Sequence, residues 1–153
     1  MAIAVFDQKH AGPNESRLRL ATLTNTRWLA ILGQGIAISI VGGYLQFTFP
    51  VAGCILLLFL SAVLNLVLIW LYPATERMSP PSVFSVLVFD VVQLSAMLYL
   101  TGGLENPFAV LMIVHVVISA ATLTVPYTIV VGGLVAFLST MLAFVHMPLP
   151  WFP

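Results

Sequence analysis

Five long apolar segments, separated by short polar breaks, dominate this chain of 153 residues. They cover residues 28–49, 51–72, 83–100, 108–125 and 127–146. A helix needs about 20 apolar residues to cross the hydrocarbon core of a membrane. The strands of a membrane barrel would instead alternate apolar and polar residues, and these segments do not. The sequence therefore predicts an all-α integral membrane protein, a polytopic helical bundle with five transmembrane helices in this chain.

The composition excludes several other classes of protein. Hydrophobic residues make up 61% of the chain and charged residues only 7%, whereas soluble domains are about 25% charged. Five Lys and Arg against five Asp and Glu leave no basic surface for phosphates, so no nucleic-acid partner is expected. The single cysteine, Cys54, lies within an apolar segment, which excludes an intrachain disulfide and a cysteine metal site. We expect no bound metal.

The distribution of cations predicts the orientation of the bundle. Residues 1–26 are predicted to be a cytoplasmic N-terminal tail, and residues 27–153 the transmembrane domain. Five helices that start from a cytoplasmic N-terminus leave every Lys and Arg on the cytoplasmic side, as the positive-inside rule requires. These cations are Lys9, Arg17, Arg19 and Arg27 before the first helix and Arg77 between the second and the third. The last residues read MPLPWFP, and we expect a sixth helix beyond them.

Polar residues inside the apolar segments are candidates for function. Asp90 lies near the middle of the third segment, where a charged side chain is costly and is a functional candidate by default. Gln93 follows on the same helix face, and His115 on the fourth segment differs from Asp90 in depth by only about 3 Å. We predict that Asp90, Gln93 and His115 form one polar layer, which serves either a structural hydrogen bond or a proton or ligand. Gln34 and Asn65 are predicted to make interhelical contacts.

The connection TGGLENPF, which precedes the fourth segment, predicts a capped helix start. Gly102 and Gly103 permit backbone conformations that other residues avoid, while Asn106 suits a helix N-cap and Pro107 the first helical position. The N–H groups of Phe108 and Ala109 are then expected to be free donors at the positive end of the helix dipole. A neutral acceptor such as a quinone carbonyl could use them, with Phe108 stacking on its ring. A plain capped turn is the alternative.

Two motifs resemble a known family. The segment GGLENPF at 102–108 is similar to the GGxxNPF signature of the RegB/PrrB-type redox-sensing histidine kinases, and TRWLAILGQ at 26–34 is similar to the pattern that opens that family's first helix. In the family, the signature lies in a short periplasmic connection between the third and fourth of six membrane helices. The resemblance covers nearly all of residues 18–153.

The resemblance implies a sensor of quinone redox state in the bacterial inner membrane. Its membrane domain would bind ubiquinone near residues 102–108, hereafter the signature loop, and would tune an attached cytoplasmic kinase. The implied quinone-binding residues are Gly102, Gly103, Leu104, Glu105, Asn106, Pro107 and Phe108. The implied partners are ubiquinone and ubiquinol, membrane lipid, a second copy of the full-length protein and a response regulator. ATP would bind only to the kinase domain, which this chain lacks, so the chain itself should have no catalytic activity.

Two other classes of function stay open from the sequence. A small transporter or assembly protein would use Asp90 as an intramembrane ion or proton site. A small membrane electron carrier would use His115 and His146 as haem ligands, although these residues lie at different depths in their helices.

Overall fold

The computed structural model describes residues 20–44, 49–72 and 78–147, and all regular secondary structure in this part of the chain is helical. A short π-helical segment, η1 (Ile40–Tyr44), continues α1, and two short 3₁₀ segments, η2 (Gly103–Glu105) and η3 (Pro107–Val110), precede α4. The five α-helices are α1 (Leu20–Ser39), α2 (Val51–Leu71), α3 (Pro80–Leu100), α4 (Leu111–Thr122) and α5 (Val125–Phe144). The predicted all-helical class is confirmed.

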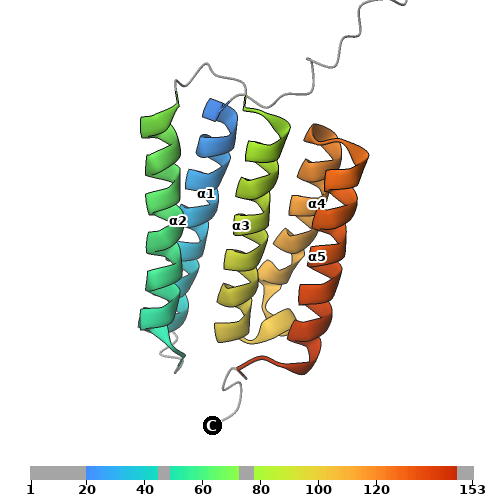
Figure 1. The fold of residues 1–153 in the computed structure, drawn as a ribbon. Coiled ribbons are helices and arrows are strands. Elements are labelled where there is room, and N and C mark those ends of the chain that lie inside the picture. Colours follow the sequence, from blue (N-terminus) through green and yellow to red (C-terminus); the bar gives the residue numbers. More distant parts are fainter. Residues whose placement is uncertain (1–19, 45–48, 73–77, 148–153) are drawn as a thin grey trace, which may run out of the picture.

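The helices run alternately up and down the bundle in two layers. In Figure 1, α2, α3 and α5 form the nearer layer, and α1 and α4 stand behind it. Helix α1 packs mainly on α2, α3 packs on α2, α4 and α5, and α4 packs on α5. The signature loop and the end of α5 lie at the same end of the bundle (Figure 1).

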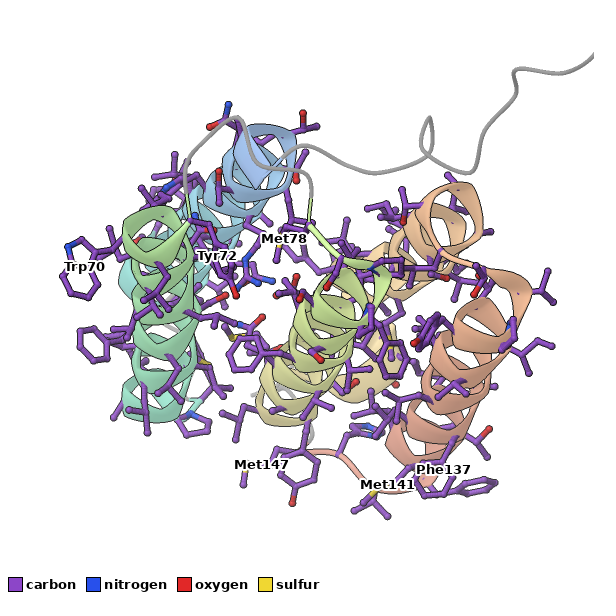
Figure 2. The ribbon with its side chains drawn as sticks, turned by 45° about the horizontal axis from the view of Figure 1, so that its top comes forward. Trp70, Tyr72, Met78, Phe137, Met141 and Met147 are labelled. Atoms are coloured by element: carbon purple, nitrogen blue, oxygen red, sulfur yellow. The ribbon has the colours of Figure 1, made fainter. Side chains whose placement is uncertain are left out.

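The outer surface of the bundle is apolar, as a membrane requires. Figure 2 shows Trp70 on α2 and Phe137 and Met141 on α5 projecting away from the other helices, and Trp70 is 87% exposed. Among the described residues, three helices are long and apolar enough to cross a membrane: α2, α3 and α5. The segment Pro107–Thr122 is apolar but shorter. The described part of the chain is thus a multi-pass helical bundle whose exposed side chains suit lipid.

Two clusters of buried side chains hold the bundle together. One joins α1, α2 and α3 and consists of Leu23, Leu68, Met78, Val83, Val86 and Leu87. The other joins α3, α4 and α5 and consists of Val91, Leu94, Leu98, Met112, Val131, Val135 and Leu142. Helix α3 contributes to both clusters, so it is the central helix of the fold.

The first helix differs from its prediction at both ends. It begins at Leu20 rather than at residue 28, so residues 20–26, predicted as part of the tail, are helical. Packing explains the difference: Leu23 and Thr24 are buried, and the Thr26 hydroxyl donates to the Leu23 carbonyl oxygen at 2.8 Å. The regular α-helix ends at Ser39 and continues as η1 to Tyr44. Arg27 is therefore a buried residue of α1, and the prediction that it precedes the first helix is wrong.

The other helix boundaries shift by smaller amounts. Helix α2 ends one residue earlier than predicted, and α3 begins three residues earlier because Pro80 and Pro81 occupy its first positions, where a missing N–H costs nothing. The predicted fourth helix begins as the 3₁₀ segment η3 and ends at Thr122 instead of residue 125. Pro126 lies in the first turn of α5, which begins at Val125. The other four cations used for the orientation fall outside the described residues. So does the MPLPWFP end, except for its first residue, Met147.

Candidate functional site

A cavity of about 620 Å³ lies between α1 and α4, with α3 as its floor. This volume falls within the range of about 300–1,000 Å³ that is usual for small-molecule sites. One face of α1 and one face of α4 supply most of the lining, because the lining residues recur every three or four positions along each helix. Most of them are apolar. The polar ones are Thr22, Thr26, Arg27, Gln34, Ser61, Asp90, Gln93, His115 and Thr122.

An ion pair within the lining of this cavity joins α1 to α3. Nη1 of Arg27 lies 3.1 Å from Oδ1 of Asp90, and the two side chains are only 6% and 13% exposed. A carboxylate or a guanidinium is stable in such surroundings only when it has a partner of opposite charge. Each residue therefore makes the burial of the other possible.

Arg27 also contacts α2 and an aromatic ring of α3. Its Nη2 donates to the Ser61 hydroxyl at 3.3 Å and lies 3.5 Å from the Ser61 carbonyl oxygen, and its Cζ lies 5.7 Å from the centre of the Phe89 ring. Within the described part of the chain, Nε of Arg27 has no hydrogen-bond partner, although it is buried. Nη1 faces Asp90 without the alignment of a hydrogen bond. Arg27 thus keeps donor capacity beside the cavity.

The predicted polar residues of the third and fourth segments line the same cavity. Nε2 of Gln93 donates to Oε1 of Gln34 at 3.4 Å, which links α3 to α1. Nδ1 of His115 lies 2.8 Å from the Leu111 carbonyl oxygen. A carbonyl only accepts, so Nδ1 carries the proton of this bond, and Nε2 of a neutral ring is left as an acceptor. Asp90, Gln93 and His115 therefore all line this cavity, and Asp90 is paired with Arg27.

The two predicted interhelical amides do make interhelical contacts. Besides the Gln34–Gln93 bond, Nδ2 of Asn65 on α2 donates to the Thr24 carbonyl oxygen of α1 at 3.1 Å. Asn65 is fully buried and does not line the cavity. The prediction for Gln34 and Asn65 is confirmed.

The signature loop is a tightly hydrogen-bonded turn. Gly102 and Gly103 have φ values of 96° and 60°, in the left-handed region that favours glycine. Asn106 is the N-cap of η3, and its Oδ1 accepts from the Phe108 N–H at 2.9 Å. Its Nδ2 donates to the hydroxyl and the carbonyl oxygen of Thr101, at 2.8 and 3.1 Å. The predicted cap at Asn106 and Pro107 is confirmed.

The same bonds overturn one prediction about the loop. The N–H groups of Phe108 and Ala109 are not free donors: the first is bonded to the Asn106 side chain, and the second donates to the Asn106 carbonyl oxygen at 2.9 Å. The cause is local, because the capping side chain that starts the helix occupies one donor and the 3₁₀ turn occupies the other. A ligand near this part of the loop therefore finds no free donor at the Phe108 and Ala109 N–H groups.

The loop is also attached to the end of α5. The His146 ring lies against Gly103, and the Met147 N–H donates to the Tyr99 carbonyl oxygen at 2.9 Å. His146 thus belongs to this contact and does not line the cavity, whereas His115 does. The two histidines are therefore not arranged around one shared site.

One residue of the signature loop reaches the cavity. Phe108 lines it at the end nearest the loop, whereas residues 102–107 do not. Leu104 and Glu105 are exposed, and Gly102 and Gly103 are buried within the turn. The loop and the cavity are thus neighbouring parts of one region, joined through Phe108.

Arg27 is the residue of this region that the sequence reasoning missed. The sequence prediction places it one residue before the first helix, as one of the cations that set the orientation. A signal was present: Arg27 and Gln34 are separated by two helical turns, which places them on one face of a continuous helix.

Among the described residues, no group of three His, Cys, Asp or Glu side chains could hold a metal ion.

The five apolar helices of the described residues, with a partly polar cavity between α1, α3 and α4, define a multi-pass helical membrane domain. The PilS-like transmembrane domain matches residues 16–151 of this chain. The chain therefore belongs to the PilS-like transmembrane domain family.

Curated relatives agree with the motif resemblance. The sensor histidine kinase RegB of Cereibacter sphaeroides is 37% identical over 131 residues, which is 86% of this chain and 28% of the relative. A second sensor histidine kinase RegB of the same species is 37% identical over 78 residues, which is 51% of this chain and 17% of that relative. The chain thus spans less than a third of the length of these relatives. No solved structure matches the chain. The resemblance to RegB-type sensor kinases is confirmed.

Proposed function

We propose that this chain is the membrane-embedded, redox-sensing input domain of a two-component sensor histidine kinase. It binds ubiquinone and ubiquinol in the bacterial inner membrane, with its N-terminus in the cytoplasm. The redox state of the quinone controls an attached cytoplasmic kinase domain, which uses ATP and phosphorylates a response regulator. The full-length protein works as a homodimer surrounded by membrane lipid.

The position of Phe108 is the observation that carries this proposal. It is the last residue of the signature loop and it lines a cavity of the size that a small ring compound needs. In this proposal, Phe108 stacks on the quinone ring, while residues 102–107 hold Phe108 in place through the Asn106 cap. The two RegB relatives, both named as sensor histidine kinases, support the assignment of the signal pathway.

The proposed mechanism is a shift between two arrangements of the helices. A quinone enters the cavity sideways from the lipid, between the third and fourth helices. The oxidised head group only accepts hydrogen bonds, whereas the reduced one also donates through its hydroxyl groups. If the two forms bind the two helix arrangements unequally, the quinone pool sets their populations in proportion to the difference in affinity.

The pairing of Asp90 with Arg27 favours a sensor over the alternative, a transporter that uses Asp90 as its ion site. An ion-transport site needs a carboxylate that is free to bind its cation, and Asp90 already faces the guanidinium of Arg27 at 3.1 Å. A transporter with Asp90 as its ion site would first have to break this buried pair.

The proposal is tested by titrating the purified chain in lipid nanodiscs with short-chain ubiquinone, oxidised and reduced, and reading tryptophan fluorescence. We expect saturable binding with unequal affinities for the two forms. Phe108→Ala should weaken binding about three- to tenfold, the range expected for one lost aromatic contact.

Phe59→Ala is the matched control, since Phe59 is an exposed phenylalanine of α2 that does not line the cavity. It should leave both affinities unchanged. Quenching that only follows the partitioning of quinone into lipid, equal in all three proteins, would contradict the proposed function.

A further inference from the structure

We infer that the Arg27–Asp90 pair is the contact through which the cavity distinguishes an oxidised from a reduced ligand. The inference rests on the proposed function, and it places the polar end of the ligand at α1 and α3 rather than at the backbone of the signature loop. The ligand class is a lipid-soluble ring compound whose oxygen atoms are carbonyls in one state and hydroxyls in the other.

The pair offers the only combination of a charged donor and a charged acceptor on the described lining of the cavity. Arg27, a residue of the cavity lining, supplies the donor: its Nε is buried and has no hydrogen-bond partner within the described residues. A buried donor without a partner costs free energy, which a ligand acceptor would recover. Asp90 supplies the acceptor, and its side chain is 13% exposed on the same wall.

The donors predicted for the loop are already occupied. The Phe108 and Ala109 N–H groups and the Asn106 side-chain NH₂ all have partners within the turn. A carbonyl oxygen of the oxidised ligand therefore accepts from Arg27, and a hydroxyl group of the reduced ligand donates to the Asp90 carboxylate. The reduced ligand thus competes with Arg27 for Asp90 and loosens the link between α1 and α3, whereas an oxidised ligand bound to Nε leaves the contact of Nη1 with Asp90 in place.

Two variants separate this role from a structural one. Gly33→Leu narrows the cavity and leaves both charges in place: Gly33 lines the cavity, and a β-carbon at this position meets no atom within 4 Å. The double variant Arg27→Met with Asp90→Asn removes both charges together, so that no unpaired charge is left to unfold the chain. Asn65→Ala is the control, because Asn65 is a buried polar residue that contacts α1 but does not line the cavity.

The experiment measures dissociation constants of decyl-ubiquinone and its quinol for the chain in nanodiscs. Gly33→Leu should weaken the binding of both forms by at least about tenfold. The double variant should weaken the binding of the form that the wild type prefers by about tenfold, the loss expected for a hydrogen bond to a charged group, and the binding of the other form by less, so that the ratio of the two affinities comes close to one. Asn65→Ala should keep the wild-type affinities and ratio.

The results separate this inference from the proposed function. Saturable, redox-dependent binding that Phe108→Ala weakens but that Gly33→Leu and the double variant leave unchanged would overturn the role of the pair and leave the sensor proposal standing. A wild-type ratio of affinities in the double variant would also overturn it. The absence of saturable binding in the wild-type chain would overturn both proposals.

Discussion

The imidazole ring of His146 lies directly against the α-carbon of Gly103. A β-carbon built on this glycine would stand 2.6 Å from Cγ of the ring, closer than real contacts allow, and the glycine has a φ of 60°. The neighbouring Met147 N–H is bonded to the Tyr99 carbonyl oxygen. The signature loop and the turn that follows α5 are therefore one packed unit, and the second glycine of the signature has a structural reason to be a glycine.

Gly103→Ala should lower the free energy of unfolding by about 1–3 kcal/mol, the usual cost of a strained backbone conformation. Unfolding of the chain in mixed micelles, followed by circular dichroism, measures the effect. Adding His146→Ala should restore the part of the lost unfolding free energy that comes from the clash with the ring. The part that comes from the positive φ of residue 103 should remain. Gly133→Ala is the control, since Gly133 lies within α5 with nothing within 4 Å of its β-carbon position; a comparable loss there would contradict the explanation.

Asn106→Ala should destabilise the chain by about 0.5–2 kcal/mol through the loss of the N-cap, with a further loss from its two bonds to Thr101. Asn106→Asp keeps the oxygen that accepts from Phe108 but removes the donors to Thr101, so its stability should fall between those of the wild type and the alanine variant. Thermal unfolding of the three proteins gives the order. An aspartate variant as unstable as the alanine variant would show that the cap contributes nothing.

Arg27→Met alone should destabilise the chain by about 3–5 kcal/mol, because it leaves Asp90 buried without its partner. Adding Asp90→Asn should restore most of the lost stability, since no charge then remains in the cavity wall. Equilibrium unfolding of the single and double variants measures the coupling between the two sites. Losses that simply add in the double variant would mean that the two side chains do not interact.

Asn65→Ala should cost about 0.6 kcal/mol, the average found for hydrogen bonds between membrane helices, and no more than about 1.7 kcal/mol. The bond from Asn65 to the Thr24 carbonyl oxygen joins α2 to the first turns of α1. Asn25→Ala, at an exposed position of α1, is the control and should be neutral. A loss of several kcal/mol for Asn65→Ala would indicate that the early part of α1 depends on this bond alone.

A cytoplasmic N-terminus places residue 105 on the periplasmic side and residue 79 on the cytoplasmic side. Both side chains are exposed. In a Cys54→Ala background, Glu105→Cys should react with a membrane-impermeant maleimide in intact spheroplasts, and Ser79→Cys only after permeabilisation. The opposite labelling pattern would reverse the orientation.

Much of the fold follows from local sequence, and its exceptions have a common cause. Helix α2 ends one residue from its predicted limit because its apolar segment is uninterrupted. The start of α1 was missed because threonines and an arginine disfavour a membrane segment by themselves. Leu23 and Thr24 nevertheless pack against other helices, and Arg27 is paired with Asp90. Contacts between residues far apart in the chain decided that boundary, and periodicity does not report them.

The candidate site was predictable where a polar residue stands alone among apolar ones. Asp90, Gln93 and His115 were identified in this way, and the capping role of Asn106 followed from the residue types beside it. The use of the loop's N–H groups was not predictable, because the geometry of the Asn106 side chain decides whether they stay free. The cavity itself depends on how α1 and α4 stand on α3, which only the assembled bundle determines.

The burial of the Arg27–Asp90 pair limits the effect of dissolved salt on the attraction between the two charges. Dissolved ions screen exposed charges beyond about 8 Å at physiological ionic strength, but they screen buried pairs much less, and these two side chains are almost withdrawn from solvent. The electrostatic attachment of α1 to α3 therefore depends little on salt concentration. A change in that attachment reports chemistry inside the bundle, and not the ionic composition of the compartments on either side of the membrane.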